Sequence, residues 1–184
     1  TSGEVVDKNI VMLPWNRRSP LSARNVVLGG LNAFGAIDEA LILYTPAGDS
    51  RQLHELPAPV IEEMIDSQIK SQFFMLKEIL LHFQRERKGI MSLIMHTEGT
   101  DTLAPLDAMA MSSFEALANS MFTFYQNEPF IVNAFASHTA QAGGFADFIR
   151  KTLTEQARTS GGRWYRYPAK GSFFKPRTGA FKRK

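Results

Sequence analysis

The chain has 184 residues, of which 44% are hydrophobic and 21% are charged, and its net charge is +3 at pH 7. This length suits one domain with a sizeable core, and the composition is that of a globular protein. The absence of cysteine excludes disulfides, thiolate metal sites and a cysteine nucleophile. Since we find no signal peptide and no apolar run of the ~20 residues that span a bilayer, we expect a cytoplasmic protein that does not bind membranes.

Short apolar runs alternate with amphipathic stretches from the start of the chain. Residues 9–13 (NIVML) are typical of a strand, which Pro14 ends. Residues 22–34 place apolar side chains on one helical face, and Gly35 is a plausible end of that helix. Residues 40–44 (ALILY) predict a second buried strand.

The alternation continues through the rest of the chain. It predicts helices at 60–87, 106–125 and 145–157 and strands at 90–95 and 130–135. The first of these helices carries more apolar surface than one sheet contact requires, which indicates either deep burial or a contact with a partner subunit. Strands that alternate with helices favour βαβ units, with right-handed crossovers that place helices on both faces of a parallel sheet.

Polar residues follow two of the predicted strands at their C-terminal ends, where open α/β sheets bind ligands. His96, Thr97 and His138 lie there, and with Asp107 they form a candidate ligand crevice. A solvated loop position is the alternative for each histidine. The four histidines of the chain have no metal-ligand spacing, so we expect no metal site.

The C-terminal segment is basic and rich in aromatic residues. Its cations form a candidate anion-binding tail: Arg163, Arg166, Lys170, Lys175 and Arg177. Basic residues interleaved with aromatics are able to bind phosphates and stack on bases. We expect one domain over residues 1–170 and an extended basic arm over 171–184, which would wrap a neighbouring subunit, contact an anionic partner or stay mobile.

An ordered series of segments resembles the short-chain dehydrogenase/reductase family. The segments are NAFGAIDEALILYTPAG, IEEMIDSQIKSQFF, GIMSLIMHTEG, SSFEALANSM, FIVNAFAS and RWYRYPA. The resemblance implies the fold of the NAD(P)-binding superfamily, a Rossmann-like three-layer α/β sandwich. Here we expect a reduced, mainly parallel sheet of four or five strands, in which RWYRYPA resembles the last strand of the family's sheet.

The resemblance also assigns the family's functional positions. Its proton-donating tyrosine falls on Asp107, its lysine on Met111 and the asparagine of its central helix on Gln68. Its serine falls near His96 or Thr97. An aspartate with an ordinary pKa near ~4 is ionised at neutral pH, and Met111 has no charge with which to tune a neighbouring acid. We therefore expect no catalytic residues at these positions.

The glycine-rich turn that brings backbone N–H groups to a dinucleotide is missing. The resemblance thus implies that the first two βα units of the family are absent, and we expect no cofactor-binding residues and no cofactor. Without those units the sheet would have a gap. We predict that residues 9–13 move into the central position beside residues 40–44.

Our leading hypothesis is a short-chain-dehydrogenase-like pseudoenzyme that forms homo-oligomers through the helices at 60–87 and 106–125, which resemble the family's subunit interfaces. One alternative is an NAD(P)-dependent oxidoreductase whose atypical site another chain completes. A second alternative is the binding of nucleic acid or another anionic partner through the C-terminal tail.

Overall fold

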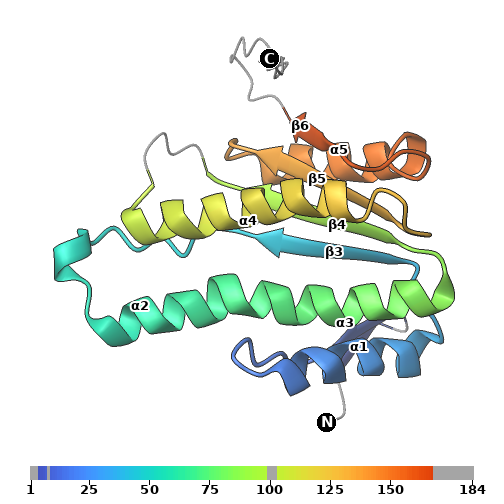
Figure 1. Cartoon of the computed structure of the whole chain (residues 1–184), viewed down its shortest axis with the longest axis horizontal. Coiled ribbons are helices and arrows are strands. Elements are labelled where there is room, and N and C mark those ends of the chain that lie inside the picture. Colours follow the sequence, from blue (N-terminus) through green and yellow to red (C-terminus); the bar gives the residue numbers. More distant parts are fainter. Residues whose placement is uncertain (1–3, 8, 99–102, 168–184) are drawn as a thin grey trace.

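Four parallel strands form the centre of the computed structural model, which describes residues 4–7, 9–98 and 103–167 (Figure 1). They lie in the order β3 (Glu39–Tyr44), β4 (Ile90–His96), β5 (Ile131–Ser137) and β6 (Trp164–Tyr167). Each neighbouring pair is parallel. The predicted α/β sandwich with a reduced sheet is confirmed.

Helices cover both faces of this sheet. One face carries α1 (Pro20–Phe34), α2 (Ala58–Met64), the π-helical segment η2 (Ile65–Lys70), α3 (Ser71–Glu86) and α4 (Pro105–Phe124). The other face carries α5 (Ala142–Glu155), and a short 3₁₀ turn, η1 (Leu53–Glu55), precedes α2. No helix among the described residues is long and apolar enough to cross a membrane.

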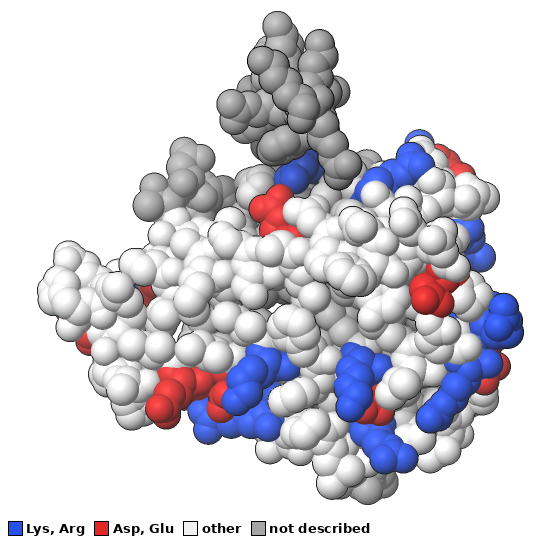
Figure 2. All heavy atoms as spheres, viewed as in Figure 1, with Lys and Arg blue, Asp and Glu red and all other residues white. Residues whose placement is uncertain are grey.

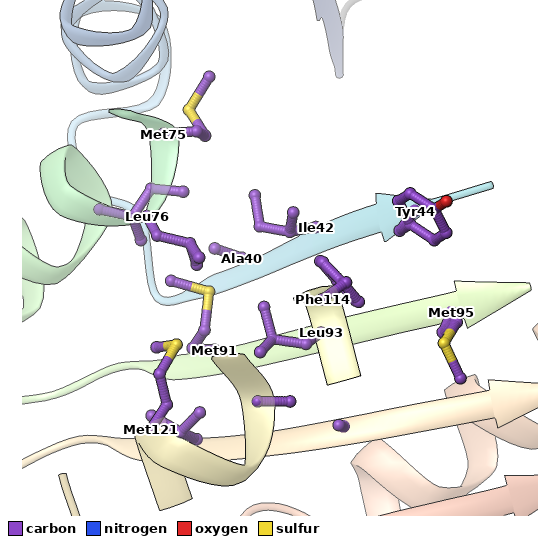
Figure 3. Packing of buried hydrophobic residues seen from close by; sticks show 14 of the residues in the cluster. Ala40, Ile42, Tyr44, Met75, Leu76, Met91, Leu93, Met95, Phe114 and Met121 are labelled. Atoms are coloured by element: carbon purple, nitrogen blue, oxygen red, sulfur yellow. The ribbon is translucent and has the colours of Figure 1, made fainter. Parts of the chain in front are cut away.

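The larger core lies between the sheet and the helices α1 to α4. Alternate residues of β3 point into it, and Figure 3 shows Ala40, Ile42 and Tyr44 facing side chains of α3 and α4. A smaller core lies under α5, where Phe135 packs with Phe145. Each strand therefore has two packing faces, as expected for a sheet inside a three-layer sandwich.

One connection differs from the expected handedness. The strand order rises steadily across the sheet, so crossovers of one hand would put every connecting helix on the same face. Yet α3 and α4 pack in the larger core, whereas α5 packs on the opposite face. The β5–α5–β6 connection therefore has the opposite hand to the other two, and helices reach both faces for this reason.

The predicted position of the N-terminal strand is wrong. β2 (Ile10–Met12) pairs antiparallel with β1 (Glu4–Asp7) in a separate hairpin and does not lie beside β3. Leu13, just after β2, packs against α1, where a Cβ added to Gly29 would meet its Cδ1 at 2.9 Å. An apolar run specifies an extended segment but not its neighbour. Among the described strands, β3 therefore pairs only with β4.

Two helix boundaries have clear local causes. The side chain of Ser19 caps α1 by accepting a hydrogen bond from the Ser22 N–H at 3.2 Å, and Gly35 ends the helix with φ 78°. The helix predicted over 60–87 is continuous in direction but contains η2, where the spacing of the backbone hydrogen bonds widens. Such π-helical segments are frequent at functional sites.

Candidate functional site

A cavity of about 510 Å³ lies at the C-terminal ends of β3 and β4, beside the N-terminus of α4. Its described lining consists of Thr45, Pro46, Gly48, Asp49, Ser50, His96, Glu98, Leu103, Ala104 and Asp107. Open parallel sheets bind ligands at this end. Two of the four residues predicted to form a crevice, His96 and Asp107, line this cavity.

Asp107 binds the loop that follows β3 through its side chain. Its side chain is 2% exposed, and its Oδ1 and Oδ2 each accept a backbone hydrogen bond at 2.9 Å, from Ala47 and Gly48 respectively. The residue lies in the first turn of α4, where the helix dipole favours a negative charge. Both carboxylate oxygens therefore serve to hold the loop against the helix.

Tyr44 lies behind this contact. Its hydroxyl donates a 3.3 Å hydrogen bond to the backbone carbonyl of Asp107, and its ring stacks on Phe114 at 5.3 Å. Burial, and then the negative charge of Asp107, raise the pKa of the Tyr44 phenol above its ordinary value. The phenol thus stays neutral and anchors the start of α4. Sequence reasoning treated Tyr44 as the end of a buried strand and missed this contact, because a tyrosine in an apolar run carries no further signal.

The two other predicted crevice residues form a pair beside the cavity. Thr97 is 2% exposed, and its Oγ1 lies 2.6 Å from Nδ1 of His138 and 3.5 Å from the carbonyl oxygen of Ser137. Neither Thr97 nor His138 belongs to the described lining of the cavity. The pair joins the end of β4 to the loop that follows β5.

His96 makes a second connection between the same segments. Its Nε2 lies 2.9 Å from the carbonyl oxygen of Thr139, and its ring stacks on Phe145 at 5.7 Å. Because a carbonyl only accepts, Nε2 carries the proton and donates it. No group of three or more metal-ligating side chains occurs in the described ranges.

The family positions that fall on Gln68 and Met111 do not belong to the described lining of the cavity. Gln68 is half-buried in η2, and Met111, one turn beyond Asp107 on α4, packs against the larger core. The described lining includes the carboxylates of Asp49 and Glu98 and no lysine or arginine. A hydrogen bond from the side chain of Arg51 at the surface lowers the pKa of the Asp49 carboxyl group to about 2, so this group is ionised at neutral pH.

The first two cations of the predicted tail, Arg163 and Arg166, contact other described residues at and just before β6. Arg166 pairs with Glu115 at 3.2 Å and lies over the Trp164 ring, 5.3 Å from its centroid. Arg163 lies 5.9 Å from the centroid of Tyr165 and donates to Ser160. The strand predicted for RWYRYPA is present, and its aromatic rings are packed within the domain. Lys170, Lys175 and Arg177 lie outside the described residues.

No family model and no curated protein matches the chain. Among solved structures, a 3-ketoacyl-ACP reductase from Sinorhizobium meliloti 1021 matches with a TM-score of 0.68 and 16% identity, over 84% of this chain and 77% of that chain.

A metagenomic short-chain oxidoreductase in complex with NADP matches with a TM-score of 0.71 and 16% identity, over 86% of this chain and 74% of that one. The structure of ElxO with NADP bound matches with a TM-score of 0.67 and 15% identity, over 86% of this chain and 77% of that chain. At these identities the likeness concerns the fold, and the chain has the fold of the short-chain dehydrogenases/reductases.

Proposed function

We propose that this chain is a short-chain-dehydrogenase-like protein without oxidoreductase activity, which acts by assembling with copies of itself or with a partner. The observation that carries this proposal is the paired hydrogen bonding of Asp107 to Ala47 and Gly48. By resemblance, Asp107 occupies the position of the family's proton donor. Both oxygens of this carboxyl group are engaged in holding the loop after β3, so the side chain has a structural role in place of the donor role.

The surroundings of the cavity support the same conclusion. By resemblance the lysine position holds Met111, which has no charge to lower the pKa of an acid or to bind a ribose hydroxyl. The described lining has no lysine or arginine to bind a pyrophosphate, and the Arg51 guanidinium near it pairs with Asp49. Because no free cation of the described lining would offset the charge of a dinucleotide, we expect no NAD(P) binding to the chain alone.

Exposed apolar side chains on α3 and α4 support assembly. Phe73 and Leu81 of α3 are 51% and 42% exposed, and Met109 and Phe124 of α4 are 42% and 79% exposed. Figure 2 shows that the face over α4 carries few charged residues, whereas Lys, Arg, Asp and Glu gather around its lower margin. Apolar surface with a charged margin is typical of protein–protein interfaces.

Nucleotide titration together with light scattering tests the proposal. We expect no saturable binding of NADH or NADPH by fluorescence, and a solution mass that is a multiple of the 20.6 kDa chain. Two of the matched structures hold NADP, so binding is what an oxidoreductase of this fold would give. Saturable NADPH binding with turnover of a carbonyl substrate would overturn the proposal in favour of an active enzyme.

A further inference from the structure

A groove of about 530 Å³ lies between the edge strand β3 and helix α5. Its apolar lining includes Leu41, Leu43, Ile94, Phe145, Ile149 and Leu153. The two β3 leucines are 49% and 55% exposed, although they belong to the central sheet. Exposed apolar surface of this kind marks an interaction site.

The same strand offers hydrogen-bonding groups along the groove. In a parallel strand, alternate residues bond to opposite sides, and the Asp38 carbonyl accepts a bond from Ile90 of β4 at 2.9 Å. The N–H and C=O groups of Glu39, Leu41 and Leu43 therefore face the other edge. No described strand pairs there. An extended segment would gain both these backbone bonds and the apolar contacts.

A second folded copy fits this edge poorly. α1 packs along α3 on the side away from α4, and the β1–β2 hairpin lies beyond β3 with α1 (Figure 1). These elements obstruct a globular partner. Even a direct pairing of two β3 edges would separate the two α5 helices by five strand spacings, ~24 Å, and leave each groove uncovered. The occupant must be a slender segment.

We propose that residues 168–184 of the chain bind in this groove as an extended segment, with Phe173 against Leu43 and α5. These residues lie outside the described part of the chain, and Phe174 and Phe181 also belong to them. They follow Tyr167 at the end of β6. This proposal concerns a surface away from the Asp107 cavity and goes beyond the function proposed above.

The end of β6 and the groove have Phe145 as a common neighbour. Phe145, in the first turns of α5, contacts Tyr167 with a centroid distance of 6.0 Å, and it also lines the groove. A helix is ~10–12 Å across, and an extended chain covers ~3.3 Å per residue. Residues 168–172 can therefore cross α5, and Phe173 reaches the groove where parallel β3 and β6 both end. The segment would then run antiparallel to β3.

The contacts of this segment are apolar and not electrostatic. The described lining of the groove includes no aspartate or glutamate that would attract the cations of the segment, and its Arg150 pairs with Asp147 at 3.5 Å. Pro176 lacks an N–H group, which an edge strand tolerates. Docking should therefore persist in high salt, whereas contact with an anionic partner would weaken steeply.

Cross-linking in the full chain tests the position of the segment. Because the chain has no cysteine, a pair of introduced cysteines reports one distance. We expect Leu43→Cys with Phe173→Cys to form an intramolecular disulfide at least tenfold faster than Leu28→Cys with Phe173→Cys. Leu28, on α1, is also exposed at 44% and serves as the matched control. Equal rates, or linkage only between two chains, would overturn the proposal.

Hydrogen exchange provides a second readout that needs no new covalent bond. We expect the double change Phe173→Asp and Phe174→Asp to speed exchange of the Leu41 and Leu43 amides at least tenfold. The control variant Lys182→Ala, in the same segment, should leave those amides unchanged. Unaltered exchange in the aspartate variant would show that the segment does not pair with β3.

Discussion

Asp107 holds together two segments that lie 60 residues apart. In Asp107→Asn one accepting oxygen becomes an NH₂ group, which cannot accept from Ala47 or Gly48. Because the site is 2% exposed, no bulk water replaces the lost partner. We expect the free energy of unfolding to fall by about 1–3 kcal/mol, measured by urea denaturation.

Asp147→Asn is the matched control for this change. Its side chain is 78% exposed and pairs with Arg150 only at 3.5 Å, so its loss should cost less than about 0.5 kcal/mol. Similar losses in the two variants would contradict the anchoring role of Asp107.

Tyr44 gives the stability of the fold a pH dependence. Burial and the charge of Asp107 raise the pKa of its phenol in the folded state above the unfolded value of about 10. The resulting stabilisation is fully present below pH ~10 and is lost as the pH rises from there toward the folded pKa. Tyr44→Phe removes this titration, so its stability should fall less steeply between pH 9 and 11 than that of the unaltered chain. Parallel urea midpoints over this range would contradict the assignment.

The sequence placed His96 and Asp107 in one candidate crevice, and both residues line the cavity, but the sequence did not reveal their contacts. The partners of Asp107 are backbone N–H groups of Ala47 and Gly48, which no side-chain pattern reveals. Their position depends on how the loop after β3 meets α4, and this is a property of the tertiary structure.

At the scale of elements, the turn between α3 and β4 is closely constrained. Gly89 has φ 146°, and a Cβ there would lie 2.3 Å from Cδ1 of the fully buried Phe83. Gly89→Ala should therefore destabilise the fold by about 2–4 kcal/mol, from backbone strain and overpacking together. The measurement is the midpoint of thermal or urea unfolding.

A second glycine provides the comparison. Gly143 lies in α5, and a Cβ added to it meets nothing within 4 Å. Gly143→Ala should be neutral or should stabilise the fold by about 0.5–1 kcal/mol, because alanine favours a helix. A loss in Gly143→Ala as large as that in Gly89→Ala would show that the cost does not arise at the turn.

The elements themselves were predictable because each has a local signal. Residues 40–44 and 130–135 are apolar runs between turn residues, and they correspond to β3 and β5 with small shifts at the ends. The neighbour of the N-terminal strand was not predictable, since periodicity says which face of a strand is buried but not which strand pairs with it. The opposite hand of the β5–α5–β6 connection likewise has no local signal.

At the scale of the whole molecule, two surfaces remain open for interaction, and they differ in kind. The β3 edge with its groove offers backbone groups with which no described strand pairs, and we propose that an extended segment binds there. The face formed by α3 and α4 offers exposed apolar side chains, through which we propose that folded subunits assemble. A change that disrupts one of these contacts should therefore leave the other intact, so assembly and docking of residues 168–184 can be measured separately.

Assembly through the helical face has a direct test. Phe73, on α3, is 51% exposed, and Phe34, near the end of α1, is exposed to a similar extent at 55%. Phe73→Asp would place an unpaired charge in the proposed interface. The dissociation constant of the oligomer, measured by light scattering, should therefore rise at least tenfold. Phe34→Asp should leave the mass unchanged. If Phe34→Asp dissociates the oligomer and Phe73→Asp does not, the subunits meet through α1, and the expected interface of residues 60–87 and 106–125 is wrong.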